Sequence, residues 1–134
     1  MALLLFLGRI LFVTFFFIGG IGHFSRRPML VGYARSLGVP AANVLVPVAG
    51  VLILAGSLSI GVGLWPDLGA LLLIIFLIPV TLWVHPYWKM TGEQRMVQSL
   101  NFWRNVTFAG GALIILFLSL QGAFPYSLTG PLFR

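Results

Sequence analysis

The sequence of 134 residues contains no cysteine and few charged residues. Without a thiol, the chain has no dithiol redox pair, no cysteine-held iron–sulfur cluster and no thiolate metal site of its own. Charged residues make up 7% of the chain, whereas a soluble globular domain carries roughly 25%. Because so little polar surface cannot cover a water-facing globule, we expect lipid to be the solvent for most of the chain. The sequence therefore predicts an integral membrane protein.

Acidic residues are especially scarce: Asp and Glu together number two, whereas Lys and Arg together number eight, which gives a net charge of +6. A nucleic-acid binder would gather its cations on one soluble face with aromatic residues between them. Here the cations stand at the ends of apolar runs, which is typical of topology signals and of attraction to anionic lipids. We therefore expect the lipid bilayer as a partner, and no nucleic acid.

The sequence shows no nucleophile–base pair, no carboxylate dyad and no cluster of metal-binding residues. We therefore expect no intrinsic cofactor and no catalysis by side chains alone.

Four apolar runs are long enough to cross a bilayer as helices, which takes about 20 residues each. They lie at about 2–22, 43–64, 68–88 and 102–120. The third run reaches this length if its helix continues past Pro86, which would place His85, Trp88 and Lys89 on one face. The runs predict an all-α fold, a transmembrane four-helix bundle, in a single integral membrane domain over residues 1–134.

The link between the first and second runs has the pattern of a short helix. Pro28 suits a first helical turn, Gly38 suits a helix end, and Pro40 prevents continuation. Between them, apolar side chains recur on one face at helical spacing: Met29, Leu30, Tyr33, Ala34 and Leu37. This pattern predicts a short interfacial helix between spans one and two.

The distribution of basic residues predicts how the chain crosses the membrane. Lys and Arg gather in the first and third links, whereas the Trp65-Pro66-Asp67 turn and the termini carry almost none. The positive-inside tendency therefore predicts that both long links are cytoplasmic and that both termini lie outside.

Glycines within the spans predict where the helices pack closely. Small residues let helix backbones approach each other in lipid, where no hydrophobic drive brings helices together. The candidates lie in spans one, two and four: Gly19, Gly20, Gly22, Gly50, Gly56, Gly61, Gly63, Gly110 and Gly111.

Arg9 is a cation inside the first span, where charge is costly. An arginine at the centre of the hydrocarbon costs about 2.5–3.5 kcal/mol on insertion scales. Three interpretations stand open for it: an ion pair with Asp67, which the topology places on the same side, a side chain extended to the outer surface, or a contact to an anion or quinone.

Two histidines end membrane spans. His23 ends the first and His85 the third, so an antiparallel bundle brings both to one side. They are interfacial residues, hydrogen-bonding groups for a bound head group, or two axial ligands of a b-type haem.

Arg104 and Asn105 begin the fourth span. They either hydrogen-bond to His85 and tie the helix ends together, or line a head-group pocket with Trp88 and Trp103 as walls.

Several segments resemble the DoxX family of small four-helix membrane proteins: LGRILFVTFFFIGGIGHF, YARSLGVP, PVAGVLILAGSLSIGVGL, HPYW and NFWRNVTFAGGALIIL. The most specific resemblance is in the last two blocks and the link between them, at His85, Tyr87, Trp88, Gln98, Phe102, Arg104, Asn105, Gly110 and Gly111. Two positions depart from the family pattern: Ile53 stands where many members carry Glu, and His23 where many carry Lys.

The resemblance implies a relative of the membrane subunits of thiosulfate:quinone oxidoreductase. On that basis we expect a non-catalytic membrane subunit or anchor of a quinone-linked redox complex, concerned with sulfur compounds or oxidative stress, in the cell inner membrane. Quinone is the expected ligand, and other membrane or redox subunits, or a second copy, are the expected partners. The candidate ligand or partner pocket consists of Arg9, His23, His85, Trp88, Trp103, Arg104 and Asn105.

Two alternatives remain open from the sequence. The first is a small-solute transporter, with a narrow polar path along Arg9, Thr14, Ser57, Ser59 and Thr81. The second is an assembly or structural protein whose glycine faces bind another membrane chain.

Overall fold

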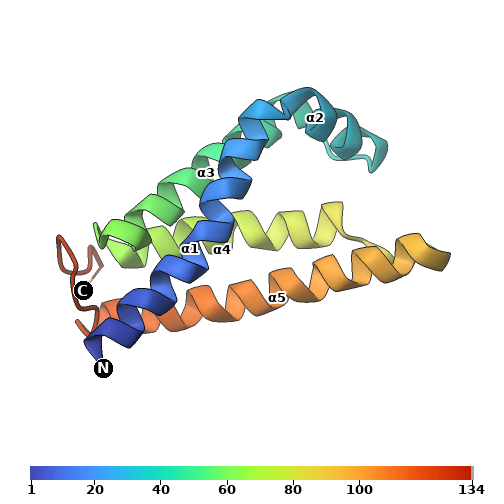
Figure 1. The fold of residues 1–134 in the computed structure, drawn as a ribbon. Helices are drawn as coiled ribbons and strands as arrows, with labels where there is room; N and C mark the ends of the chain where they lie inside the picture. Colours follow the sequence, from blue (N-terminus) through green and yellow to red (C-terminus); the bar gives the residue numbers. More distant parts are fainter. Residues whose placement is uncertain (134) are drawn as a thin grey trace.

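The computed structural model describes residues 1–133, and its long elements are all helices. These are α1 (Ala2–Ser25), α2 (Arg27–Ser36), α3 (Ala42–Val62), α4 (Pro66–Val84) and α5 (Gly92–Leu120), with a 3-10 turn, η1, at Tyr87–Lys89. Four segments are long and apolar enough to cross a membrane: Ala2–Ser25, Ala42–Val62, Pro66–Lys89 and Gly92–Leu120. The predicted all-α transmembrane four-helix bundle with a short helix between spans one and two is confirmed (Figure 1).

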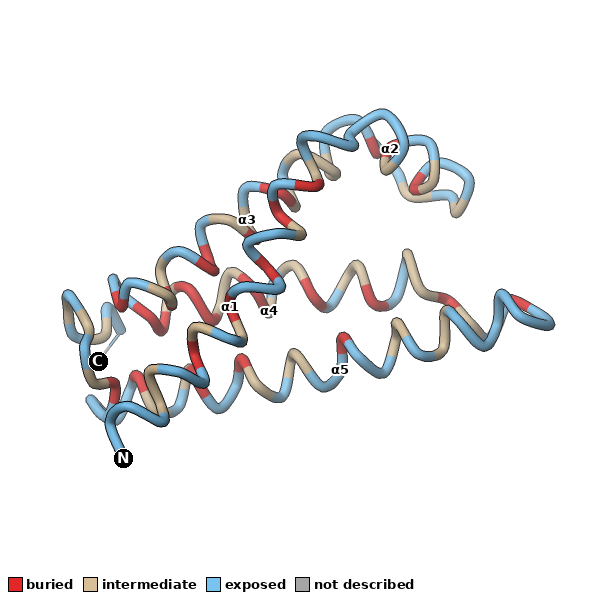
Figure 2. The backbone as a smooth tube through the Cα atoms, viewed as in Figure 1, coloured by how far each residue is buried: buried red, intermediate tan, exposed pale blue. Residues whose placement is uncertain are grey.

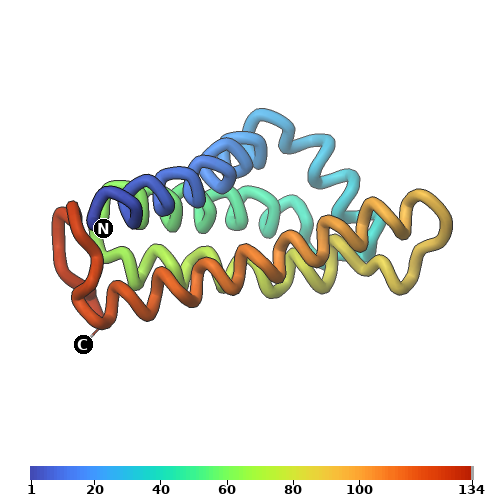
Figure 3. The backbone as a smooth tube through the Cα atoms, turned by 60° about the horizontal axis from the view of Figure 1, so that its bottom comes forward, coloured from blue at the N-terminus to red at the C-terminus, as the bar shows by residue number. Residues whose placement is uncertain are grey.

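The bundle is wedge-shaped. α1 packs against α3, α3 against α4, and α4 against α5. Both chain termini lie at one end, on the left of Figure 1, where α3 turns into α4; toward the other end the α1–α3 pair diverges from the α4–α5 pair. The rotated view in Figure 3 shows α2 returning from the end of α1 toward the first half of α5. The two pairs therefore stay tightly packed near the termini and separate toward α2.

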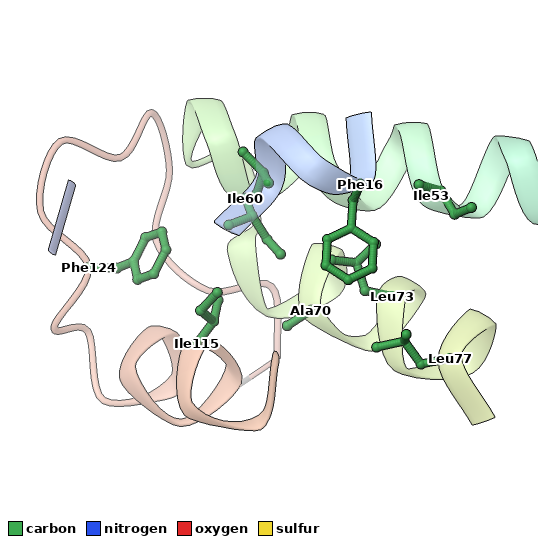
Figure 4. Packing of buried hydrophobic residues seen from close by; sticks show 9 residues of the cluster. Phe16, Ile53, Ile60, Ala70, Leu73, Leu77, Ile115 and Phe124 are labelled. Atoms are coloured by element: carbon green, nitrogen blue, oxygen red, sulfur yellow. The ribbon is translucent and has the colours of Figure 1, made fainter. Parts of the chain in front are cut away.

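All four spans contribute to one buried apolar cluster near the closed end. Figure 4 shows Phe16 from α1, Ile53 and Ile60 from α3, Ala70, Leu73 and Leu77 from α4, and Ile115 from α5, together with Phe124 from the segment after α5. Outward-facing positions are exposed along each helix (Figure 2), and they include Leu11, Ile114 and Phe117. Apolar surface of this extent would be a liability in water, so lipid is the medium that covers it.

Glycines bring α3 and α4 into backbone contact near their connecting turn. A Cβ built on Gly56 would lie 2.9 Å from the carbonyl oxygen of Gly69 and equally close to the Leu73 side chain. Real Cβ atoms essentially never approach other atoms this closely, so this contact requires glycine. The close-packing prediction is confirmed here.

Other glycines divide into two groups. Gly20 lies against Leu54, Gly50 against His23 and Phe24, and Gly111 against Phe12, so the packing prediction is also confirmed at these positions. Gly19 and Gly110 face open space, and the prediction is wrong for them. Spacing alone could not separate the two groups, because neighbouring glycines on a helix point in different directions.

A substitution at Gly56 tests the α3–α4 contact. We expect Gly56→Leu to lower the free energy of unfolding by about 2 kcal/mol, because overpacking forces helices or side chains apart. The control is Gly110→Ala, which we expect to leave the stability unchanged or raise it by up to about 1 kcal/mol through helix propensity. Denaturant unfolding in mixed micelles, followed by circular dichroism, measures both. Equal stabilities of the two variants would contradict this packing.

Helix boundaries around the third link differ from the prediction. The α-helix of the third span ends at Val84, and His85 has φ −119° and ψ 50°, so the expectation of a continuous helix past Pro86 is wrong. The reason is local, because a residue before proline is driven out of the α region and proline cannot donate to the preceding turn. The fourth helix begins at Gly92 rather than near residue 102. Its first turns are polar, and hydropathy therefore missed them.

The interfacial helix α2 is confirmed, although its buried face is shifted. Val31 and Ala34 are buried, whereas Met29 is exposed. The helix is also tied to α3 by a side chain. Pro47 lacks the N–H that would bond the carbonyl of Asn43, and Arg27 donates to that carbonyl at 3.0 Å instead. A proline in span two thus creates the acceptor that holds α2 in place.

Candidate functional site

A cavity of about 300 Å³ lies between the diverging helix pairs, at the end of the bundle away from the chain termini. All five helices contribute to its lining. Most of the wall is apolar, formed by residues such as Phe15, Phe16, Phe76 and Val80. The residues with polar side chains are His23, Tyr33, His85, Arg104 and Asn105. The cavity therefore combines a small polar group of residues with an otherwise apolar wall.

A second, apolar cavity of about 150 Å³ adjoins the first between α3 and α4. The two share His23, Phe76 and Val80 among their lining residues. The second one extends to Ile75 and Trp83, which are 56% and 49% exposed on the membrane-facing surface. The apolar lining therefore extends from residues beside the polar group to the surface that lipid covers.

A chain of hydrogen bonds crosses the open end of the wedge. His85 Nδ1 donates to Oε1 of Gln98 at 2.6 Å, and Gln98 Nε2 donates to the Tyr33 hydroxyl at 3.2 Å. The three residues belong to the end of α4, to α5 and to α2. Gln98 thus links the α4–α5 pair to α2 across the open end. Burial raises the pKa of Tyr33 above its usual value, so its hydroxyl keeps its proton at neutral pH.

Gln98→Leu tests this link. We expect the free energy of unfolding to fall by about 2 kcal/mol, because two side-chain hydrogen bonds are lost and each contributes about 1 kcal/mol net. Gln94→Leu is the matched control, because Gln94 lies one turn earlier on α5 and is exposed. The same unfolding assay measures both variants. A loss at Gln94 as large as at Gln98 would show that the effect comes from the helix surface and not from the link.

His23 is oriented by its own helix. Its Nδ1 lies 2.9 Å from the carbonyl oxygen of Gly19, to which it donates. Both histidines therefore donate through Nδ1 to a protein oxygen, which leaves each Nε2 free, and the described residues provide no partner for either. The prediction that an antiparallel bundle brings His23 and His85 to one side is confirmed, since both line one cavity.

Arg104 and Asn105 line the same cavity but do not bond to His85. The predicted tie between these residues and His85 is wrong, because Gln98, two turns earlier on α5, takes that place. The guanidinium of Arg104 lies over the ring of Phe15, 5.3 Å from its centroid. Asn105 is buried, at 6% exposure. Of the two alternatives that the sequence left open for Arg104 and Asn105, the lining of a pocket is the one that remains.

Trp88 and Trp103 do not form the walls that the sequence suggested. Both are about half exposed and neither lines the cavity. Trp88 packs edge-on against Tyr87 and Phe102, and Trp103 packs against Phe102. The end of α4 at Val84 breaks the helical register and turns Trp88 away from the interior. Phenylalanines of α1 and α4 provide the walls instead.

Arg9 lies at the opposite end of the bundle and belongs to another structure. Its guanidinium donates to the carbonyl oxygens of Pro125 and Tyr126, at 3.0 and 2.7 Å. It also lies over the rings of Phe6 and Phe124. The side chain is 2% exposed, so the ion pair with Asp67 and the extension to the surface are both wrong. Arg9 holds the segment after α5 and is no part of the cavity.

Asp67 holds the same segment from the other side. Its two carboxylate oxygens accept the backbone N–H groups of Leu132 and Phe133, at 3.0 and 2.7 Å. Thr129 adds contacts to the α3–α4 turn, donating its backbone N–H to Gly63 and accepting that of Trp65. Residues 121–133, called the C-terminal clamp below, thus close the narrow end of the bundle.

Two residues of the cavity region escaped the sequence-based list, Gln98 and Tyr33. Gln98 was among the positions that carry the family resemblance, and this was the signal that could have identified it. The helical spacing places Tyr33 on the apolar face of the short helix, and its sequence position gives no sign that its hydroxyl accepts a hydrogen bond from Gln98. The described residues contain no cluster of three or more His, Cys, Asp or Glu side chains.

Comparison with known proteins gives consistent relationships. A family model described as DoxX matches residues 4–86. The chain is 31% identical over 112 residues to a protein of Escherichia coli (strain K12) named inner membrane protein YphA, covering 84% of this chain and 80% of that protein. No solved structure gives a match. The family match includes both histidines and stops before Gln98, Arg104 and Asn105.

Proposed function

Because this chain belongs to the DoxX family, we propose that it is a non-catalytic membrane subunit or anchor of a quinone-linked redox complex and holds a quinone-type head group in its cavity. The observation that carries the proposal is the distribution of polarity in that cavity. His23, Tyr33, His85, Arg104 and Asn105 line one cavity, and an adjoining apolar cavity reaches the lipid-facing surface. An isoprenoid quinone has the same division, with a small polar ring and a long apolar tail.

The proposed complex lies in the cell inner membrane, with both long links cytoplasmic. The name of the similar Escherichia coli protein supports the compartment, and the basic residues of α2 and of the third link support the orientation. Other membrane or redox subunits, concerned with sulfur compounds or oxidative stress, are the proposed partners.

The residues expected to form a solute path have other roles. Thr14, Ser57 and Thr81 each donate their hydroxyl to a carbonyl of their own helix. Ser59 bonds to the carbonyls of the α3–α4 turn, and Arg9 holds the C-terminal clamp. Since these groups are engaged in bonds within the chain, they favour no transport path.

Native mass spectrometry of the protein extracted gently from its own membrane tests the proposal. We expect a bound quinone or a stoichiometric redox subunit. A bare chain or a simple homo-oligomer that carries only bulk phospholipid would overturn it.

The cavity itself is tested with variants in the same experiment. We expect the double variant His85→Leu, Arg104→Leu to lose its bound quinone-type ligand about tenfold or more, because it removes a donor to a ring oxygen at Arg104 and an acceptor for a ring hydroxyl at His85. Trp103→Leu is the control, since Trp103 lies outside the cavity lining, and its quinone content should stay at the wild-type level. Retention of quinone by a folded double variant would place the ligand elsewhere.

A further inference from the structure

Resting on the proposed function, we infer that the cavity distinguishes the redox state of its ligand and prefers a quinol, with two ring hydroxyls, over the corresponding quinone. The inference comes from the hydrogen-bonding groups that the cavity presents. A ligand that pairs with every one of these groups binds more tightly than a ligand that leaves some of them without a partner.

The histidines supply the acceptors. In each ring Nδ1 is already used as a donor, by His85 to Gln98 and by His23 to Gly19. A neutral imidazole that donates through Nδ1 can only accept at Nε2. Since both rings belong to the cavity lining, their Nε2 atoms are its candidate acceptors, and neither has a partner among the described residues.

The described lining of the cavity provides no counter-charge for an imidazolium. Among its described lining residues none is acidic, and Arg104 already contributes one positive charge. An imidazolium would add another cation to a mostly apolar cavity without a carboxylate to balance it. Asp67 lies at the far end of the bundle, where it binds the C-terminal clamp, and Glu93 is exposed in the first turn of α5.

The donors come from other side chains. Tyr33 accepts its hydrogen bond from Gln98 and so keeps its own O–H for another partner. Arg104 and Asn105 contribute further N–H groups. The cavity therefore presents donors and acceptors together, and a ligand must supply both to leave none unpaired.

A quinol meets this requirement and a quinone does not. Each quinol hydroxyl donates one hydrogen bond and accepts others, so it can pair with an imidazole nitrogen and with a donor side chain. A quinone carbonyl only accepts, which leaves both Nε2 atoms unpaired in a cavity from which the ligand has displaced water. A buried polar atom without a partner is costly, so the oxidised form binds more weakly.

The same geometry accommodates the tail. The adjoining cavity between α3 and α4 is lined mainly by aliphatic and aromatic side chains and reaches the lipid-facing Ile75 and Trp83. Pro79 of α4 lines it as well. An alkyl or isoprenoid tail attached to a head group near the histidines would leave by this route.

The test measures both redox forms on one sample. The full chain is placed in lipid nanodiscs, and binding of an alkyl benzoquinol and of its benzoquinone is measured anaerobically by isothermal titration calorimetry. We expect the quinol to bind more than tenfold more tightly than the quinone, because one unpaired buried polar group already corresponds to about tenfold and the quinone leaves two. In His23→Leu and in His85→Leu, the ratio of quinol affinity to quinone affinity should fall toward one.

The outcomes separate the two claims. Equal affinities, or tighter binding of the quinone, would overturn the redox preference and leave the proposed function standing. Binding of neither form by the folded wild-type chain would overturn the proposed quinone site, and the preference with it. Because the primary comparison uses the wild-type protein, it does not depend on whether the variants fold.

Discussion

Arg9→Leu is expected to lower the free energy of unfolding by about 3 kcal/mol, because hydrogen bonds from a charged donor contribute about 1.5–3 kcal/mol each. The guanidinium reaches two successive carbonyls of the C-terminal clamp, Pro125 and Tyr126, and is almost fully buried between them and two phenylalanine rings. A leucine fills part of the space and leaves both carbonyls without this donor. Denaturant unfolding in mixed micelles measures the loss.

Two further variants decide what the Arg9 effect means. Arg9→Lys keeps the charge but replaces a planar fork with a single ammonium, so we expect it to recover only part of the stability. Arg35→Leu is the control for loss of positive charge; Arg35 is exposed on α2, and such surface changes usually stay within about 0.5 kcal/mol. An Arg9→Leu protein as stable as the wild type would show that the clamp does not depend on this side chain.

The membrane spans were predictable because lipid imposes one demand on the sequence, a long apolar helix. The same measure failed at the third link for a physical reason. Hydropathy detects contact with lipid, whereas helix formation also occurs in polar sequence, and the polar start of α5 from Gly92 continues the helix beyond the apolar run. The end of α4 was readable in principle, since Pro86 restricts His85.

The sequence predicted which helix ends meet at the site, because topology determines this. It did not predict the hydrogen-bond partners of individual side chains. An even number of antiparallel crossings brings the ends of the first and third spans together, which placed His23 and His85 correctly. The partner of His85 depends on where α2 and the first turns of α5 meet, and these positions follow from tertiary packing. The sequence therefore offered Arg104 or Asn105, whereas the structure places Gln98 there.

The C-terminal clamp was the largest omission. A short segment with Pro and Gly after the last span is typical of an irregular tail, and pattern analysis assigns it no role. Its order comes from backbone groups that bond to Arg9, Asp67 and the α3–α4 turn. Hydrogen bonds to backbone groups cannot be inferred from residue types, because every residue has the same backbone. The sequence therefore suggested an ion pair between Arg9 and Asp67, two opposite charges at one end of the bundle. In the structure each charge binds the clamp instead.

Asp67→Asn is expected to cost about 3 kcal/mol, since the carboxylate accepts two charge-assisted hydrogen bonds and the amide can accept only one of them. Of the two backbone N–H groups, those of Leu132 and Phe133, one would then face the amide NH₂ of the asparagine. Both of these groups are donors, so no hydrogen bond forms between them. Asp67 is fully buried at the start of α4, so water cannot replace the lost acceptor. The same unfolding assay applies.

A double-mutant cycle then separates the clamp from a direct ion pair. In the full chain Arg9→Leu and Asp67→Asn should be less than additive, because either change loosens the segment that the other side chain binds. In a chain shortened after Leu120 both effects should become small and independent, since the clamp is gone. A direct pair would keep its coupling energy in the shortened chain. Coupling that survives removal of residues 121–134 would thus restore the ion pair, and coupling that disappears identifies the C-terminal clamp as the structure through which the two charges act.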